Sequence, residues 1–178
     1  MSDPDFTGTL ESDRSRGSVL CCIVLQARMW RTDGREYAVP TRILIADDDA
    51  TIRLLLRRVL EQQPDWQVCG DASTGVEAIA KVEQLHPDVV VMDLSMPVMT
   101  GLQASPAIAR AHPRLPMLLI SVQEVSRQLA REARNAGYRG AVTKSSGNEV
   151  LRGVEALLRK ETFFWADDGS PISAEWDR

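Results

Sequence analysis

The chain has 178 residues and a formal net charge of −4 at pH 7, with 44% hydrophobic and 26% charged residues. This length and mixture fit one globular domain with extensions and argue against a disordered chain. The mildly acidic balance argues against bulk, charge-driven binding to nucleic acid or to anionic membranes.

The N-terminal 40 residues and the cysteines indicate the compartment. Cys21, Cys22 and Cys69 are odd in number and lack zinc-ligand spacing, so they predict neither disulfides nor a zinc site. The apolar run at residues 19–25 is shorter than the roughly 20 residues that a membrane-spanning helix needs. We therefore expect a cytoplasmic protein with no membrane association, and we read residues 1–40 as a partly disordered N-terminal extension.

From residue 42 onward, aliphatic runs of strand length alternate with segments of helical spacing. The predicted strands are residues 42–46, 66–70, 88–94, 116–121 and 140–144. Helices are predicted from Ile52 to before Pro64, from a Ser73–Thr74 cap to His86, from a loop with Pro97 and Gly101 through Ile108, from about Glu124 to Asn135, and over residues 150–158.

This strict alternation predicts an α/β fold in which a parallel sheet is covered by helices on both faces. Five strands favour the flavodoxin-like, doubly wound order 2-1-3-4-5. We place this domain at residues 41–161 and read residues 162–178 as a C-terminal tail.

Polar residues follow the predicted strands at one edge of the sheet. Asp47 and Asp48 follow the first strand and Asp93 closes the third, and these strands are neighbours in the predicted order. Three carboxylates in one crevice repel each other, and a hard cation such as Mg²⁺ relieves that repulsion. Ser121 ends the fourth strand and Lys144 ends the fifth.

Carboxylates, a hydroxyl and a lysine around Mg²⁺ suit phosphoryl transfer, in which a carboxylate can itself be the nucleophile. The sequence has no Walker A motif or other glycine-rich phosphate loop, so nucleotide binding is not indicated. The alternative for Asp47 and Asp48 is structural, because acidic residues often lie at the N-terminus of a helix.

Four segments together resemble the receiver domain of two-component response regulators. They are Ile-Leu-Ile-Ala-Asp-Asp-Asp at residues 43–49, Val-Val-Val-Met-Asp-Leu-Ser-Met-Pro at 89–97, Leu-Ile-Ser at 119–121 and Gly-Ala-Val-Thr-Lys at 140–144. The resemblance implies that Asp93 accepts a phosphoryl group from a histidine kinase or phosphotransfer protein.

The resemblance also implies the surroundings of that aspartate. Asp47 and Asp48 would bind Mg²⁺, one directly and one through water, and the backbone carbonyl of Ser95 would be a further ligand. Ser121 would hydrogen-bond the phosphoryl oxygens and Lys144 would pair with them.

Within this family, Lys144-Ser145-Ser146 and residues 161–164 resemble the NarL/LuxR-type branch, whose members usually continue into a DNA-binding helix-turn-helix. Residues 162–178 are too few for that domain. We therefore expect a receiver that signals through a phosphorylation-dependent protein interaction, does not bind nucleic acid directly and is no enzyme beyond its own phosphorylation.

Two alternatives remain open. One is a DNA-binding transcriptional response regulator whose helix-turn-helix output domain is missing or truncated. The other is an aspartyl-phosphate hydrolase, which would need a second acid two residues beyond Asp93, where this chain has Ser95.

Three positions depart from the family pattern. Ala141 replaces an aromatic residue that changes rotamer on activation, Ser145 replaces a proline, and Pro106 predicts that the third helix begins late or kinks. Arg127, Arg131 and Arg134 share one face of the fourth helix. That face is either solvated or a partner surface, for example of a homodimer.

Overall fold

The structure, a computed structural model, describes residues 39–145 and 147–164. Its strands are β1 (Thr41–Ala46), β2 (Trp66–Ala72), β3 (Val89–Asp93), β4 (Met117–Ser121), β5 (Gly140–Thr143) and β6 (Phe163–Phe164). Its helices are α1 (Ala50–Leu60), α2 (Gly75–Leu85), α3 (Gly101–Ala111), α4 (Arg127–Asn135) and α5 (Gly147–Leu158). The strands pair in parallel in the order β2-β1-β3-β4-β5-β6. The predicted doubly wound order 2-1-3-4-5 is confirmed, with a short sixth strand added beside β5.

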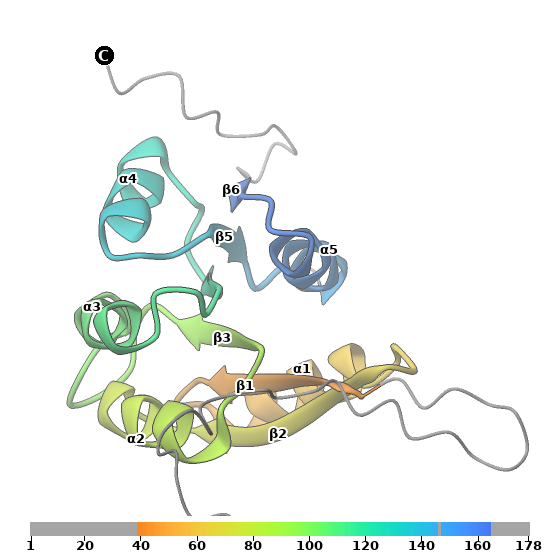
Figure 1. The fold of residues 1–178 in the computed structure, drawn as a ribbon. Coiled ribbons are helices and arrows are strands. Elements are labelled where there is room, and N and C mark those ends of the chain that lie inside the picture. The colour runs from red at the N-terminus through yellow and green to blue at the C-terminus, as the bar shows by residue number, and fades with distance from the viewer. Residues whose placement is uncertain (1–38, 146, 165–178) are drawn as a thin grey trace, which may run out of the picture. The chain divides into compact units, whose positions relative to one another are not determined.

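The sheet separates two hydrophobic cores. Helices α2, α3 and α4 lie on one face of the sheet, and α1 and α5 lie on the other (Figure 1). Their side chains contribute to the two cores. Successive strand residues alternate between the cores, as Val90 and Val91 of β3 do. Every residue of β3 and β4 is buried, as expected for central parallel strands covered on both faces.

A polar side chain caps the N-terminus of each of the first four helices. The caps are Asp49, Thr74, Thr100 and Ser126, and the side chain of each accepts a hydrogen bond from a backbone N–H of the first turn. The Ser126 cap makes α4 begin at Arg127, three residues after the predicted start at Glu124.

Pro106 lies inside α3, which nevertheless begins at Gly101. The expectation of a late start is therefore wrong. Proline has no N–H to donate to the carbonyl four residues earlier, which here belongs to Leu102. That carbonyl instead lies 3.5 Å from the Ser105 hydroxyl, which donates to it. This local substitution accommodates the proline within the helix.

Strand β6 falls in the segment predicted as a tail. The Phe163 N–H donates to the Arg139 carbonyl at 2.9 Å, and Phe164 pairs with Ala141. Phe163 packs in the core beside α5, and Phe164 in the core beside α4. Glycine at position 140 makes room for this strand, because a Cβ there would lie 2.6 Å from the Phe163 carbonyl oxygen.

Two other expectations lie outside the described residues. These are the partly disordered extension before Val39 and the part of the predicted C-terminal tail that follows Phe164. Within the part of the chain that the structure describes, no helix has both the length and the apolar character to span a bilayer.

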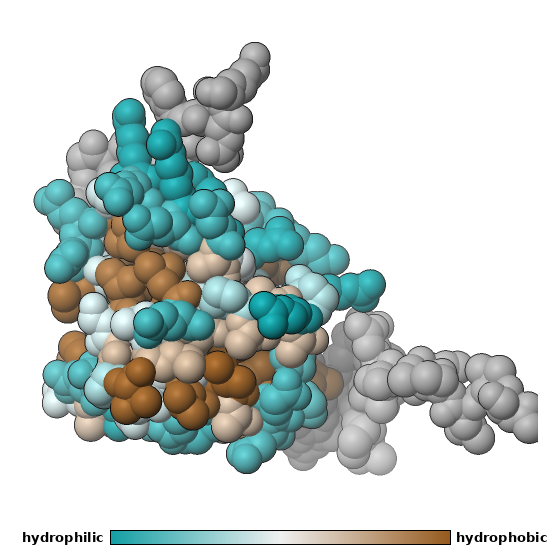
Figure 2. Space-filling view, turned by 90° about the vertical axis from the view of Figure 1, so that its left-hand side faces the viewer, coloured by the Kyte–Doolittle hydropathy of each residue, from teal (hydrophilic) through white to brown (hydrophobic). Residues whose placement is uncertain are grey.

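The surface over α2, α3 and α4 is divided by polarity. Hydrophilic side chains gather over α4, at the top of Figure 2, whereas apolar side chains reach the surface below it. Val76 on α2 is among the exposed apolar residues, at 50% of its full accessibility. The α4 side is thus the more polar part of this face.

The packing of β6 leads to a stability prediction. Phe164 is only 4% exposed, so replacing it with Ala should lower the free energy of unfolding by about 3 kcal/mol, the scale of a buried Phe→Ala change. Val122→Ala is the matched control, since Val122 is 79% exposed and its truncation should cost less than about 0.5 kcal/mol. Urea unfolding measures both, and equal losses would contradict the packing of β6.

Candidate functional site

The turn after β1 carries three consecutive acidic residues with different surroundings. Asp47 is fully buried, whereas Asp48 and Asp49 are exposed. Asp49 Oδ1 accepts the Thr51 N–H at 2.7 Å, and backbone hydrogen bonds from Thr51 and Ile52 lower the pKa of Asp49. The cap of α1 is therefore Asp49, not Asp47 or Asp48.

Asp93 meets this turn because β1 and β3 are parallel neighbours that end at the same edge. Asp93 is 3% exposed, and its Oδ2 accepts the Ser95 N–H at 2.9 Å. Asp47, Asp48 and Asp93 each offer a carboxylate oxygen, and these oxygens lie within 4.8 Å of one another. The structure thus brings together the three acids that were predicted to meet.

Lys144, just beyond β5, is the cation of this cluster. Its Nζ lies 2.5 Å from Asp47 Oδ2 and 2.8 Å from Asp93 Oδ1. Burial alone would lower the pKa of Lys144, but the ion pairs with Asp47 and Asp93 outweigh burial and raise the pKa. For Asp47, burial outweighs Lys144 and raises the pKa of the carboxyl group.

One oxygen of Asp47 is left without a directed hydrogen bond. Asp47 Oδ1 accepts the Asp49 N–H at 3.0 Å, while the buried Oδ2 has only the ionic contact with Lys144. Three carboxylates thus face one ammonium group. A hard divalent cation fits this donor set, because it prefers oxygen ligands and would supply the missing positive charge.

Ser121 ends β4 beside this cluster and is 2% exposed. Its hydroxyl oxygen accepts the Gln123 N–H at 3.0 Å, and its carbonyl accepts the Lys144 N–H at 2.7 Å. The hydroxyl therefore fixes the start of the β4–α4 loop, and the carbonyl fixes the backbone of the lysine. Ser95 is exposed in the loop after β3, and its backbone N–H is the group that contacts Asp93.

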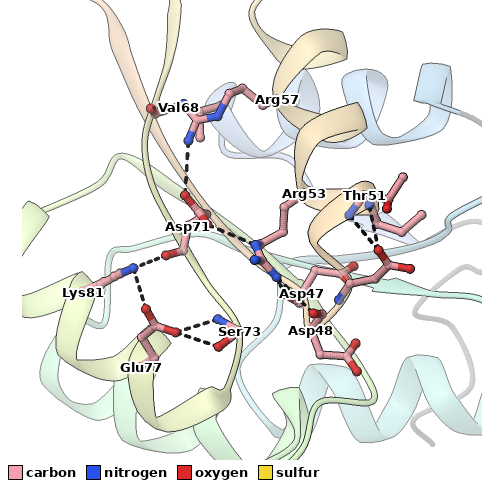
Figure 3. A network of polar contacts seen from close by, with 12 residues as sticks. Asp47, Asp48, Thr51, Arg53, Arg57, Val68, Asp71, Ser73, Glu77 and Lys81 are labelled. Carbon is pink, nitrogen blue, oxygen red and sulfur yellow. Dashed lines mark hydrogen bonds and ion pairs between the residues drawn. The ribbon is translucent and has the colours of Figure 1, made fainter.

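The sequence did not predict that two further residues, Gly101 and Arg53, contribute to the arrangement of the acids. Gly101 lets α3 approach Asp93, because a Cβ at this position would lie 2.2 Å from the Asp93 carbonyl oxygen. Arg53 donates to the backbone carbonyls of Asp47 and Asp48 (Figure 3). The available signal for Arg53 was its place one turn after the Asp49 cap, which directs its side chain back over the turn.

The opposite edge of the sheet has a cavity of about 460 Å³. It is lined by residues that precede the strands, among them Asp88, Arg114, Arg139 and Lys160, and it shares no residue with the acidic cluster. The acidic cluster at the carboxyl ends of the strands is therefore separate from this cavity.

Most of the domain matches one known protein family. The response regulator receiver domain family matches residues 43–154. The chain is also similar to a two-component response regulator of the LuxR family from Aurantimonas sp. SI85-9A1, at 31% identity and a TM-score of 0.68. That similarity covers 72% of this chain and 91% of the solved one.

Two curated relatives match the same region. The oxygen regulatory protein NreC of Staphylococcus aureus is 36% identical over 124 residues, which are 68% of this chain and 57% of NreC. A protein-glutamate methylesterase/protein-glutamine glutaminase of Methanosarcina acetivorans is 40% identical over 108 residues, which are 61% of this chain and 30% of that protein.

These relatives correct one expectation. The prediction that the protein is no enzyme is wrong, because similar chains from Methanosarcina and Thermotoga maritima are named as enzymes. The similarity spans about a third of their length. That prediction rested only on the chemistry at the sheet edge, and a receiver domain is compatible with an enzyme.

Three observations indicate the same family. They are the strand order, the acidic cluster at the carboxyl ends of β1 and β3, and the family match over residues 43–154. The similarity to the LuxR-family regulator extends over almost all of that solved chain. The chain belongs to the response regulator receiver domain family of two-component signalling proteins.

Proposed function

We propose that the protein receives a phosphoryl group on Asp93 from a histidine kinase or phosphotransfer protein. A carboxylate oxygen of Asp93 would form a bond to phosphorus while the P–N bond of the donor phosphohistidine breaks, and the electron pair leaves with the imidazole nitrogen. The observation that carries this proposal is the place of Asp93, with Lys144 at 2.8 Å and the oxygens of Asp47 and Asp48 within 4.8 Å.

The cofactor we propose is Mg²⁺. Asp47, Asp48, Asp93 and the backbone carbonyl of Ser95 would hold it, and when bound it would neutralise charge on the phosphoryl oxygens. The support is the donor set and the buried Asp47 Oδ2, which lacks a directed hydrogen bond.

The roles we propose for the other two residues follow from their contacts. Lys144 already lies between Asp47 and Asp93, so its ammonium group can turn from these carboxylates to the new phosphoryl oxygens. The Ser121 side chain would turn toward the phosphoryl group, so that its hydroxyl donates to a phosphoryl oxygen and leaves the Gln123 N–H. Releasing Gln123 loosens the loop that leads to α4.

We propose α4 as the element that reports phosphorylation to a protein partner or to a second copy of the chain. Ala141 has no ring to reorient, but Phe164 of β6 lies beside it in the sheet. The Arg134 guanidinium of α4 stacks over this ring, 4.1 Å from its centroid. A shift of α4 would therefore change the contact between Arg134 and Phe164 of β6.

We also propose the domain limits and the compartment. Residues 41–161 would be the receiver domain, and residues 1–40 and 162–178 extensions of it, with β6 the part of the second extension that packs on the sheet. The free thiol of Cys69 agrees with a reducing cytoplasm.

The first prediction concerns the phosphoryl acceptor. Asp93→Asn should abolish incorporation of one acid-labile phosphoryl group from a small phosphodonor with Mg²⁺, because an amide is not a competent nucleophile. Asp88→Asn is the matched control, since Asp88 precedes the opposite end of the same strand and should leave labelling unchanged. Intact-mass spectrometry measures both, and labelling that persists in Asp93→Asn would refute the assignment.

The second prediction concerns the metal ligands. Replacing Asp47 and Asp48 with Asn together should remove Mg²⁺ binding in a calorimetric titration, because two of three carboxylates are lost. Asp65 and Asp88 replaced together with Asn are the control, and this variant should bind Mg²⁺ like the wild type. Unchanged affinity of the first variant would show that the metal binds elsewhere.

The raised pKa of Asp47 adds a pH dependence to this prediction. Folding favours the protonated carboxyl group, so wild-type stability contributed by Asp47 falls as the pH rises through its folded-state pKa. Without metal, Asp47→Asn should therefore be more stable than the wild type at neutral pH, and the difference should shrink as the pH falls through the folded-state pKa and vanish below the unfolded-state pKa. Urea unfolding at several pH values tests this, and a difference that grows on acidification would contradict it.

The third prediction concerns α4. Beryllofluoride, a phosphoryl mimic, should increase hydrogen exchange at the Gln123 amide, which loses its acceptor on Ser121, and should change exchange along α4. Amides of α2 serve as the internal reference and should not change. Changes confined to Asp93 and the loop that follows it would contradict a response through α4.

A further inference from the structure

Arg53 of α1 joins the metal-ligand turn to strand β2. Its Nη1 donates to the backbone carbonyl of Asp47 at 2.7 Å and to that of Asp48 at 3.1 Å. Its Nε donates to Asp71 Oδ2 at 3.0 Å. Figure 3 shows the guanidinium group between the turn and Asp71. One planar group thus holds two consecutive peptide carbonyls and one carboxylate.

Asp71 is itself held from both neighbouring helices. On one side, Arg57 Nη2 lies 3.4 Å from Asp71 Oδ1. On the other, Lys81 of α2 donates to the Asp71 carbonyl and pairs with Glu77 at 2.6 Å. Asp71 is thus contacted at its carboxylate by Arg57 and at its backbone by Lys81, and these contacts help to orient the carboxylate that binds Arg53 (Figure 3).

The two carbonyl contacts fix both peptide planes of the turn. Asp47 and Asp48 project from these planes, and their like charges together with Asp93 would otherwise push the turn apart. A site whose ligands are already in place loses less conformational entropy on binding a cation. Before a cation binds, Arg53 thus opposes the repulsion among the three carboxylates. A bound cation would relieve the same repulsion.

We propose that Arg53 is a positioning residue, which acts through the carbonyls of Asp47 and Asp48 to hold their carboxylates ready for a divalent cation. This inference rests on the proposed function, because it takes Mg²⁺ as the ligand of the cluster. Arg53 touches neither the cation nor the phosphoryl group, and its effect is on the order of the turn.

Arg57 makes the proposal testable. Both arginines pair with Asp71, but Arg57 donates to the Val68 carbonyl, away from the turn. The Asp71 side chain is 45% exposed, so the ion pairs themselves contribute little to stability. A role confined to the ion-pair network would make the two arginines equivalent, whereas positioning of the turn separates them.

The experiment compares Arg53→Met, Arg57→Met and Arg58→Met, which remove one guanidinium each from the same helix while keeping an unbranched side chain. Arg58 is exposed and serves as the surface control. Calorimetric titration with Mg²⁺, well below the thermal midpoint of each variant, should give a dissociation constant about tenfold higher for Arg53→Met. The other two variants should stay within about twofold of the wild type.

A second readout needs no metal. Hydrogen exchange of the Asp49 amide, which donates to Asp47 Oδ1, reports the order of the turn. It should be faster in Arg53→Met and unchanged in Arg57→Met. Arg53→Lys keeps the charge but not the planar fork, so it should show intermediate exchange and affinity, and it carries the test if Arg53→Met fails to fold.

Equal Mg²⁺ affinities for the Arg53 variants and the wild type, or equal losses in Arg53→Met and Arg57→Met, would overturn the inference. Failure of the proposed function looks different. In that case the wild-type protein itself would not bind Mg²⁺, whatever residue stands at position 53.

Discussion

The site is organised around the ammonium group of Lys144, whose side chain is 11% exposed. Lys144 Nζ lies 2.5 Å from a carboxylate oxygen of Asp47, in the turn after β1, and 2.8 Å from one of Asp93, at the end of β3. Without this cation, two almost fully buried carboxylates would face each other across the switch point of the sheet, at a large electrostatic cost. The ammonium group balances this repulsion only in part, because Asp48 adds a third negative charge to the cluster. The remaining imbalance is what makes the crevice suited to a divalent cation and a phosphoryl group.

The rest of the fold supports this arrangement from several directions. The parallel pairing of β1 with β3 brings Asp93 to the turn with Asp47, and the close approach of α3 at Gly101 fixes the backbone of Asp93. Arg53 fixes the turn, and Ser121 connects the same edge to the loop before α4. The outermost strand, β6, connects α4 to the sheet, because Arg134 of α4 stacks on Phe164. The proposed chemistry and its proposed output therefore share the strands β4 and β5.

Strand-end residues were the part of the site that could be predicted from the sequence. Asp47, Asp93 and Lys144 directly follow or close aliphatic runs, and the parallel order dictates that these ends share an edge. Arg53 could not be placed in this way, because its importance depends on which carbonyls its side chain reaches. Strand β6 was missed because two residues carry no periodic signal, and its pairing depends on the space left by Gly140. A cap of α1 was considered only for Asp47 and Asp48, and the backbone geometry of the turn assigns it to Asp49.

The most direct test of the account is to locate a bound divalent cation by paramagnetic relaxation. Mn²⁺ favours the same oxygen ligands as Mg²⁺ and broadens the amide resonances of residues near it. We expect substoichiometric Mn²⁺ to broaden the amides of Asp47 to Asp49 and Asp93 to Ser95 first, and excess Mg²⁺ to restore them. Broadening that begins instead at Asp88 or Glu161, at the opposite edge of the sheet, would contradict the account.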